Sequence, residues 1–153
     1  MERTLIILKP DCVQRRLIGR IVQRFEDKGL LIAAMKLMQI ERSLAERHYA
    51  PHKGKPFYPG LIDYITAGPV VVMVASGANA ISIARKMMGK TFGYEAEPGT
   101  IRGDFGVSKT FNLIHGSDSP ESAETEIALY FRPTELLTYT AAADAWISKP
   151  GEL

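Results

Sequence analysis

The chain has 153 residues, of which 46% are hydrophobic and 24% charged, with a formal net charge of +2. This composition excludes a disordered or fibrous chain, and the length predicts a single domain over residues 1–153. No apolar run approaches the ~20 residues of a membrane span, so we expect no membrane partner, no signal peptide and a cytoplasmic location. The single cysteine, Cys12, excludes an intramolecular disulfide and a cysteine zinc site. The small positive charge is weak evidence for a nucleic-acid partner, and we expect none.

The first forty residues predict two strands with a helix between them. Thr4–Leu8 is a short apolar run of the kind found in buried strands. From Gln14, apolar residues recur at helical spacing, and Gly29 stands where a C-terminal helix cap belongs. The repeating apolar residues are Ile18, Ile21, Val22 and Phe25. Leu30–Ile40 is rich in aliphatic residues and predicts a strand that returns beside the first.

The next segment predicts two short helices and a central strand. Ser43–Glu46 has the pattern of a capping box, and the helix that it opens is expected to reach about Tyr49. A second short helix is expected within residues 57–66. Val70–Ala75 has the highest β-propensity of the chain and predicts a central strand.

The second half of the chain predicts another helix, a long loop and the last strand. Asn79 is a candidate N-cap for a helix that ends at Gly89. Residues 90–110 show no clear period and contain several glycines, and a loop of this length inside a compact domain usually has a function. Phe111–Ile114 predicts the last strand. Ser119-Pro120 predicts a helix start, with serine as the N-cap and proline at the first helical position.

Together these elements predict an α/β protein of the α+β type. Pro133 is expected to begin a further helix through Leu137, and Trp146 and Ile147 are apolar enough for the tail to pack on the body or on a neighbouring chain. The order strand, helix, strand, strand, helix, strand predicts a ferredoxin-like βαββαβ antiparallel sheet with additional helices.

The strongest chemical signal is the segment Asn112–Asp118. It places one imidazole, His115, after an apolar pair and before Gly116, Ser117 and Asp118. A neutral imidazole is a capable nucleophile near pH 7, and a glycine beside it allows close approach of the backbone. Taken alone, the heptapeptide fits equally well a histidine that closes a strand and bonds to its own loop.

This segment resembles the active-site signature of nucleoside diphosphate kinases, Asn-x-x-His-Gly-Ser-Asp. Three further segments match that family in order and spacing: Lys9–Asp11, Gly68–Val71 and Pro98–Phe105. The similarity runs from Arg3 to Ile147, nearly the whole chain. It implies a ferredoxin-like fold and an enzyme that transfers the γ-phosphoryl group of a nucleoside triphosphate to a nucleoside diphosphate. It also implies a ping-pong mechanism through phosphohistidine at His115, with broad tolerance of base and sugar.

The resemblance implies roles for the cations and amides of the site. Arg85, Thr91 and Arg102 would hold the phosphates. Lys9 and Asn112 would bond the sugar hydroxyls, and Lys9 would also lie near the transferred group. Taken singly, each of these residues fits an ordinary solvated surface position, although an arginine fork suits phosphate well.

The resemblance also implies a cluster around the imidazole. Tyr49 would support the γ-phosphate and His115, Glu126 would orient the imidazole, and Ser117 would bond in the same cluster. The other interpretation of Glu126 is a solvated acid in the early turns of its helix.

For the nucleotide base, Phe57 matches the stacking aromatic of the family, with Leu61 one helical turn further on. Core packing is the alternative interpretation for both. Stacking discriminates poorly among bases, which fits broad specificity. No set of carboxylates suggests a resident metal, so Mg²⁺ is expected to arrive with the nucleotide, and Asp118 to contact it through water.

Two rival classes use similar features. Ferredoxin-like sheets also bind RNA, but they need aromatic residues on two central strands, and Thr4–Leu8 and Val70–Ala75 carry none. A sensor that binds nucleotides without turnover would have no need of His115.

The resemblance implies assembly as well, because the family forms tetramers or hexamers. Where the family usually has Thr-Asn-Pro in the long loop, this chain has Thr91-Phe92-Gly93, followed by Tyr94. The aromatic residues add interface area, so we expect a homohexamer, with a homotetramer as the alternative. Replacing Gly93 by proline is expected to raise the melting temperature if the backbone there suits proline.

Overall fold

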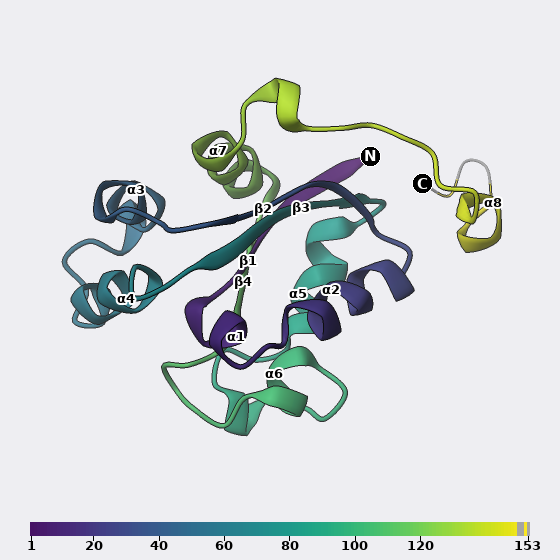
Figure 1. Cartoon of the computed structure of the whole chain (residues 1–153). Coiled ribbons are helices and arrows are strands. Elements are labelled where there is room, and N and C mark those ends of the chain that lie inside the picture. Colours follow the sequence, from purple (N-terminus) through teal and green to yellow (C-terminus); the bar gives the residue numbers. More distant parts are fainter. Residues whose placement is uncertain (150–151, 153) are drawn as a thin grey trace.

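A four-stranded antiparallel sheet organises the chain, as Figure 1 shows. The computed structural model describes residues 1–149 and 152. The strands lie in the order β2-β3-β1-β4, and each neighbouring pair is antiparallel. They are β1 (Glu2–Leu8), β2 (Leu31–Met38), β3 (Val70–Gly77) and β4 (Ile114–Gly116). The ferredoxin-like prediction is confirmed.

Helices cover both faces of this sheet (Figure 1). The α-helices are α1 (Pro10–Gln14), α2 (Ile18–Asp27), α3 (Arg42–His48), α4 (Tyr58–Ile65), α5 (Ala80–Met88), α6 (Ile101–Phe105), α7 (Pro120–Tyr130) and α8 (Asp144–Ile147). Short 3₁₀ helices are η1 (Ala50–His52), η2 (Gly93–Glu95) and η3 (Pro133–Glu135).

The alternation of side chains along β1 divides the core into two layers. Ile6 and Leu8 pack with residues of α2 and α5, whereas Leu5 and Ile7 pack with residues of α3, α4 and α7. Because both faces are covered, the central strands read as continuous apolar runs in the sequence.

Several helix ends follow the sequence signals. Gly29 and Gly89 have φ of +90° and +81°, a region that glycine enters without a steric penalty. The Ser119 hydroxyl accepts a hydrogen bond from the Ser122 N–H at 3.1 Å, and Pro120 follows it at the start of α7.

At two other helix starts the expected side-chain caps do not form, although α5 does begin after Asn79 and end before Gly89 as predicted. The capping box at Ser43 does not form, because α3 begins at Arg42 and Glu41 is its N-cap. The Asn79 side chain makes no capping bond, and the carboxylate of Glu2 accepts the Ile81 N–H instead, at 2.8 Å. The helix predicted after Gln14 forms as α2, which begins at Ile18. The short α1 before it was not predicted, and Arg16 (φ +57°) lies between the two.

The last strand was also misplaced. It spans Ile114–Gly116 instead of Phe111–Ile114, because Leu113 adopts φ +69° and interrupts the extended backbone. Two bonds hold this residue: its N–H donates to the Asp11 carboxylate at 3.1 Å, and its carbonyl accepts the Lys9 N–H at 2.8 Å. His115 therefore lies within the strand and does not follow it.

The long segment 90–110 contains η2 and α6, which the sequence did not indicate. Pro133 begins only the short η3, after which the Leu137 N–H donates to the Ala33 carbonyl at the edge of β2. In the tail, Ile147 lies against Gly29, whereas Trp146 is 92% exposed. Among the described helices, none combines the length and the apolar character that a membrane span requires.

The expectation for Gly93 was wrong as well. A Cβ built there would lie 2.4 Å from the backbone of Gly106, and the Gly93 N–H donates to the Ser108 carbonyl at 3.3 Å. Proline or alanine at position 93 should therefore lower the free energy of unfolding by roughly 1–3 kcal/mol, which thermal melting would measure. Gly19→Ala is the control, since its Cβ meets open space in helix α2. An unchanged or higher melting temperature for Gly93→Ala would contradict this packing.

Candidate active site

The position of His115 in the sheet determines the direction in which its side chain points. It pairs with Ile7 across β1 and β4, and Ile7 belongs to the core layer under α3, α4 and α7. Helix α7 presents Glu126 to this face, and the His115 Nε2 lies 3.0 Å from the Glu126 Oε2. Gly116 is needed beside it, because a Cβ there would lie 2.6 Å from the Met88 sulfur.

The carboxylate of Glu126 determines which nitrogen of the neutral His115 imidazole carries the proton. It also accepts the Ser117 hydroxyl at 2.6 Å. Burial alone would raise the pKa of Glu126, but the hydrogen bonds from His115 and Ser117 outweigh it and lower the pKa. An ionised carboxylate only accepts hydrogen bonds, so in the neutral imidazole of His115 the proton lies on Nε2 and the lone pair on Nδ1.

Three buried polar side chains, those of Lys9, Asn112 and Arg102, lie beside His115 and form the floor of the site. Lys9 is 6% exposed and its Nζ donates to the Asn112 side-chain oxygen at 2.7 Å. The Asn112 amide in turn donates to the Thr91 carbonyl at 3.2 Å. Burial, and then the charge of Arg102, lower the pKa of Lys9 to about 7, although Asp11 opposes them.

Arg102 is 4% exposed and links three backbone segments at the floor of the site. Its guanidinium donates to the carbonyls of Asn112 (3.1 Å), Gly89 (3.1 Å) and Ile114 (2.6 Å). Burial, and then the charge of Arg85, lower the pKa of Arg102 to about 10, so it remains a cation near neutral pH. Since a guanidinium has five N–H donors, two remain for a phosphate.

The structure brings these residues together around one cleft of about 580 Å³. Of the residues proposed from the sequence, its lining includes Lys9, Tyr49, Phe57, Leu61, Arg85, Thr91, Arg102, Asn112 and His115. A smaller cavity of about 250 Å³ also borders His115 and is lined by Glu126 and Asp118 among others. Ser117 is buried and reaches the cluster through Glu126.

The mouth of the cleft carries an exposed aromatic ring, whereas its inner end contains a buried hydroxyl. The Phe57 ring is 54% exposed and Leu61 is partly buried, so Phe57 is not a core residue. Deeper in, the Tyr49 ring lies 6.2 Å from the His115 ring, and its hydroxyl is buried without a hydrogen-bond partner. An arriving phosphate oxygen would supply that missing partner.

Two residues near the site, Asp11 and His48, were not among the site residues proposed from the sequence. The Asp11 carboxylate accepts the Leu113 N–H and the Tyr64 hydroxyl, and so holds the strained residue before β4. The His48 ring lies edge-on to that of His115, with 4.7 Å between centroids. Burial, and then the charge of His115, lower the pKa of His48 to about 3, so this imidazole is neutral. Asp11 had a signal in its motif, but nothing near His48 in the sequence indicated this contact.

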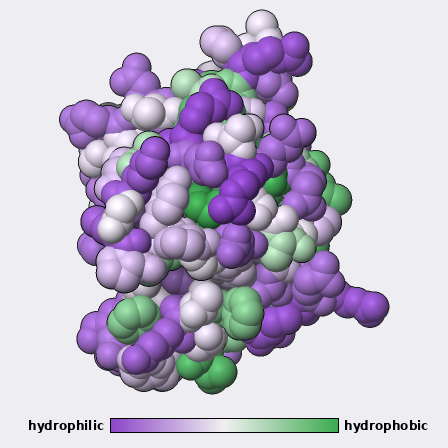
Figure 2. Space-filling view, turned by 90° about the vertical axis from the view of Figure 1, so that its left-hand side faces the viewer, coloured by the Kyte–Doolittle hydropathy of each residue, from purple (hydrophilic) through white to green (hydrophobic). Residues whose placement is uncertain are grey.

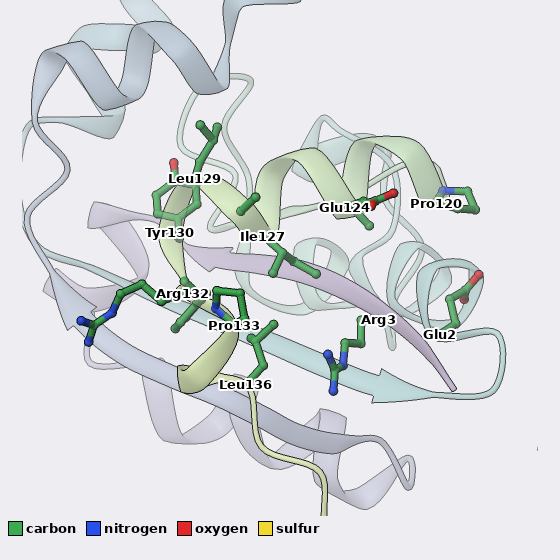
Figure 3. Close-up of a pocket in the computed structure, with 13 residues that line it drawn as sticks. Glu2, Arg3, Pro120, Glu124, Ile127, Leu129, Tyr130, Arg132, Pro133 and Leu136 are labelled. Carbon is green, nitrogen blue, oxygen red and sulfur yellow. The ribbon is translucent and has the colours of Figure 1, made fainter.

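A larger cavity of about 780 Å³ lies elsewhere, between α7, the start of β1 and η3 (Figure 3). Its lining is mainly apolar, with Ile127, Leu129, Pro133 and Leu136 around the opening. None of its described lining residues is a histidine, cysteine, serine or lysine. The histidine and the buried cations described above line the smaller cleft instead.

Comparison with known proteins agrees with this geometry. The family model described as nucleoside diphosphate kinase matches residues 2–136. A nucleoside diphosphate kinase of Thermomicrobium roseum is 58% identical, over 96% of this chain and 99% of that protein. One of Thermococcus kodakarensis is 60% identical, over 94% of this chain and 84% of that protein. The halophilic nucleoside diphosphate kinase of Halobacterium salinarum, solved in complex with CDP, superposes with a TM-score of 0.94. That enzyme is 49% identical, and the match covers 97% of this chain and 99% of that one.

Proposed function

Because the chain belongs to the nucleoside diphosphate kinase family and is therefore a phosphotransferase, we propose that its reaction passes through a phosphohistidine at His115. The γ-phosphoryl group of a nucleoside triphosphate is transferred to the histidine, the diphosphate leaves, and a second nucleoside diphosphate takes the group up. One nucleotide cleft serves both half-reactions, since the two substrates occupy it in turn.

The first half-reaction uses the lone pair of the His115 Nδ1. It attacks the γ-phosphorus, a P–N bond forms, and the P–O bond to the β-phosphate breaks with its electron pair leaving on the diphosphate. The imidazole acquires positive charge, which Glu126 stabilises through the Nε2 bond of 3.0 Å. The second half-reaction is the reverse, with a different diphosphate as acceptor.

Most of the remaining catalysis is positioning and neutralisation of phosphate charge. Arg85, Thr91 and Arg102 line the cleft where the phosphates would lie. The free Tyr49 hydroxyl is suited to a γ-phosphate oxygen. Lys9 and Asn112, already joined at 2.7 Å, are suited to the sugar hydroxyls.

The base would stack on Phe57, which is exposed at the mouth of the cleft. Stacking tolerates purines and pyrimidines, so we infer broad base specificity. The Halobacterium relative was solved in complex with CDP, which supports nucleotide binding by this chain. Mg²⁺ would enter as part of the nucleotide substrate, with the exposed carboxylate of Asp118 close enough to contact its waters.

The observation that carries the proposal is the Nε2 bond to Glu126, which leaves Nδ1 as the nucleophile beside a cleft rich in cations. Steady-state kinetics with two nucleotides tests it. A ping-pong mechanism gives parallel double-reciprocal lines, and label exchanges between ATP and ADP without a second nucleoside. Intersecting lines, or no partial exchange, would rule out the phosphohistidine route.

The pKa of Lys9 gives a prediction for nucleotide binding. At about pH 8 much of Lys9 is neutral in the free protein, because its pKa is about 7. An anionic phosphate nearby favours the charged form, so binding should take up protons at that pH. Affinity should therefore fall as the pH rises above about 7. Calorimetry in two buffers of different ionisation enthalpy would measure the uptake, and Lys9→Met should abolish it. Uptake unchanged in that variant would exclude Lys9 as its source.

For assembly we propose a homohexamer. The rings of Phe92 and Tyr94 stack on each other with 6.0 Å between centroids, and both are exposed. Val107 from the same segment and Phe111 directly after it are exposed as well. Figure 2 shows separate apolar areas near the lower end of one face. Light scattering at micromolar concentration should give a mass near six chains, and replacing Phe92 and Tyr94 together by serine should lower it. A mass near four or two chains for the native protein would rule out the hexamer.

A further inference from the structure

A second imidazole lies beside the proposed nucleophile without an evident task. The His48 side chain is 1% exposed, and its Nε2 is buried with no hydrogen-bond partner. The nearest carboxylate oxygen is the Glu126 Oε1, at 3.8 Å, which is too far for a hydrogen bond. A buried polar atom without a partner carries a free-energy cost, so this nitrogen is available to a ligand.

The atoms around this nitrogen have the chemistry of a metal site. One ring nitrogen of His48, one of His115 and a carboxylate oxygen of Glu126 all lie within 4.8 Å of one another. The Glu126 carboxylate is 3.8 Å from the His48 Nε2 and 3.0 Å from the His115 Nε2. Two imidazoles and one carboxylate form a common ligand set for Zn²⁺ and similar ions. Mg²⁺ in contrast prefers six oxygen ligands and would not select it.

The surroundings support a metal in two further ways. The His48 Nδ1 lies 2.9 Å from the Tyr130 hydroxyl, which can accept its proton and so leave a lone pair on Nε2. Such an outer bond orients most metal-binding histidines. The cavity of about 250 Å³ is lined by all three ligands and by Asp118, and gives an ion a path to them.

We propose that His48, His115 and Glu126 bind one borderline divalent cation, Zn²⁺ or an ion of similar preference. Ligand atoms on a tetrahedral Zn²⁺ lie roughly 3.4 Å apart, so the three ligand atoms, now within 4.8 Å of one another, would draw closer around the ion. The fourth position faces the cavity and takes water.

A metal here would act on the reaction through the tautomer of His115. With Nε2 bound to the ion, the imidazole proton resides on Nδ1, and the lone pair that would attack the γ-phosphorus is lost. The ion also occupies the carboxylate that stabilises the imidazole. Zn²⁺ is therefore a reversible inhibitor of phosphoryl uptake. This consequence rests on the proposed function, whereas binding of the ion does not.

Binding is tested on the full chain without a histidine tag. Zn²⁺ titrated against a chromophoric chelator should show one site per chain, and Co²⁺ should give visible absorption typical of nitrogen and oxygen ligands. His48→Gln and Glu126→Gln should each weaken Zn²⁺ binding by at least about tenfold, whereas His52→Ala, the remaining histidine, should not. Where His48→Gln does not fold, Glu126→Gln carries the same comparison. Native affinity in a folded ligand variant would overturn the proposal.

Inhibition of phosphoryl uptake by Zn²⁺ is tested in a separate experiment. Zn²⁺ should prevent labelling of the protein by ATP and Mg²⁺, and a chelator should restore it. Absence of labelling even without Zn²⁺ would count against the proposed function and leave the binding result intact. Normal labelling at saturating Zn²⁺ would overturn the inhibitory role.

Discussion

His115→Ala should lower the rate of phosphoryl exchange between ATP and a nucleoside diphosphate by at least about a thousandfold, because it removes the nucleophile itself. Nucleotide binding should remain measurable by calorimetry, since the cations of the cleft come from other segments of the chain. A coupled assay with a second nucleotide measures the rate. The small alanine leaves space next to Tyr49 and His48, so folding is checked by thermal melting.

The matched control is His52→Ala. His52 lies in the short η1, its imidazole is partly exposed, and it takes no part in the bonds around Glu126. This variant should keep its activity. Appreciable exchange in His115→Ala would exclude the histidine as the phosphoryl carrier, and loss of exchange in both variants would point to a general disturbance of the cleft.

Arg102→Met should have the largest effect on stability. It leaves the carbonyls of Gly89, Asn112 and Ile114 without their donor in a buried region. Each unpaired group costs about 1–3 kcal/mol, so the free energy of unfolding should fall by roughly 3 kcal/mol or more. Two of these carbonyls adjoin or lie in β4, so the position of His115 suffers as well. Urea unfolding would measure the loss.

Arg85→Met separates the structural role from the phosphate role. Arg85 is exposed, and its one hydrogen bond among the described residues is a long one, 3.4 Å to the Gly116 carbonyl. We therefore expect weaker nucleotide binding with stability changed by no more than about 0.5 kcal/mol. An equal loss of stability in both variants would contradict the view that Arg102 alone braces the strand.

The sheet could be predicted because its signals are local. Leu5–Leu8 and Val70–Ala75 are apolar throughout, as is typical of strands covered on both faces. Gly29, Gly89 and Ser119 mark helix ends through backbone freedom or a side-chain cap, and both act within a few residues. The proposed site residues came from the resemblance to a known family, and not from local sequence patterns.

What could not be predicted depends on contacts between distant segments. Leu113 adopts a strained conformation because Asp11, 102 residues earlier, accepts its N–H, and that conformation displaces β4. The Ile81 N–H at the start of α5 donates to the carboxylate of Glu2, near the beginning of the chain, and not to the side chain of Asn79. The burial of His48 against His115 and Glu126 follows from the packing of α3 on α7. The members of each pair lie far apart in the sequence, so no local sequence pattern indicates that they are in contact.

The most direct test of the phosphohistidine is the intact mass of the native chain after incubation with ATP and Mg²⁺, measured under alkaline conditions that preserve a P–N bond. We expect a mass increase of one phosphoryl group per chain, lost on adding a nucleoside diphosphate and localised to the peptide that contains His115. An unchanged mass, a phosphoryl group that survives acid, or one located on another residue would contradict the proposed mechanism.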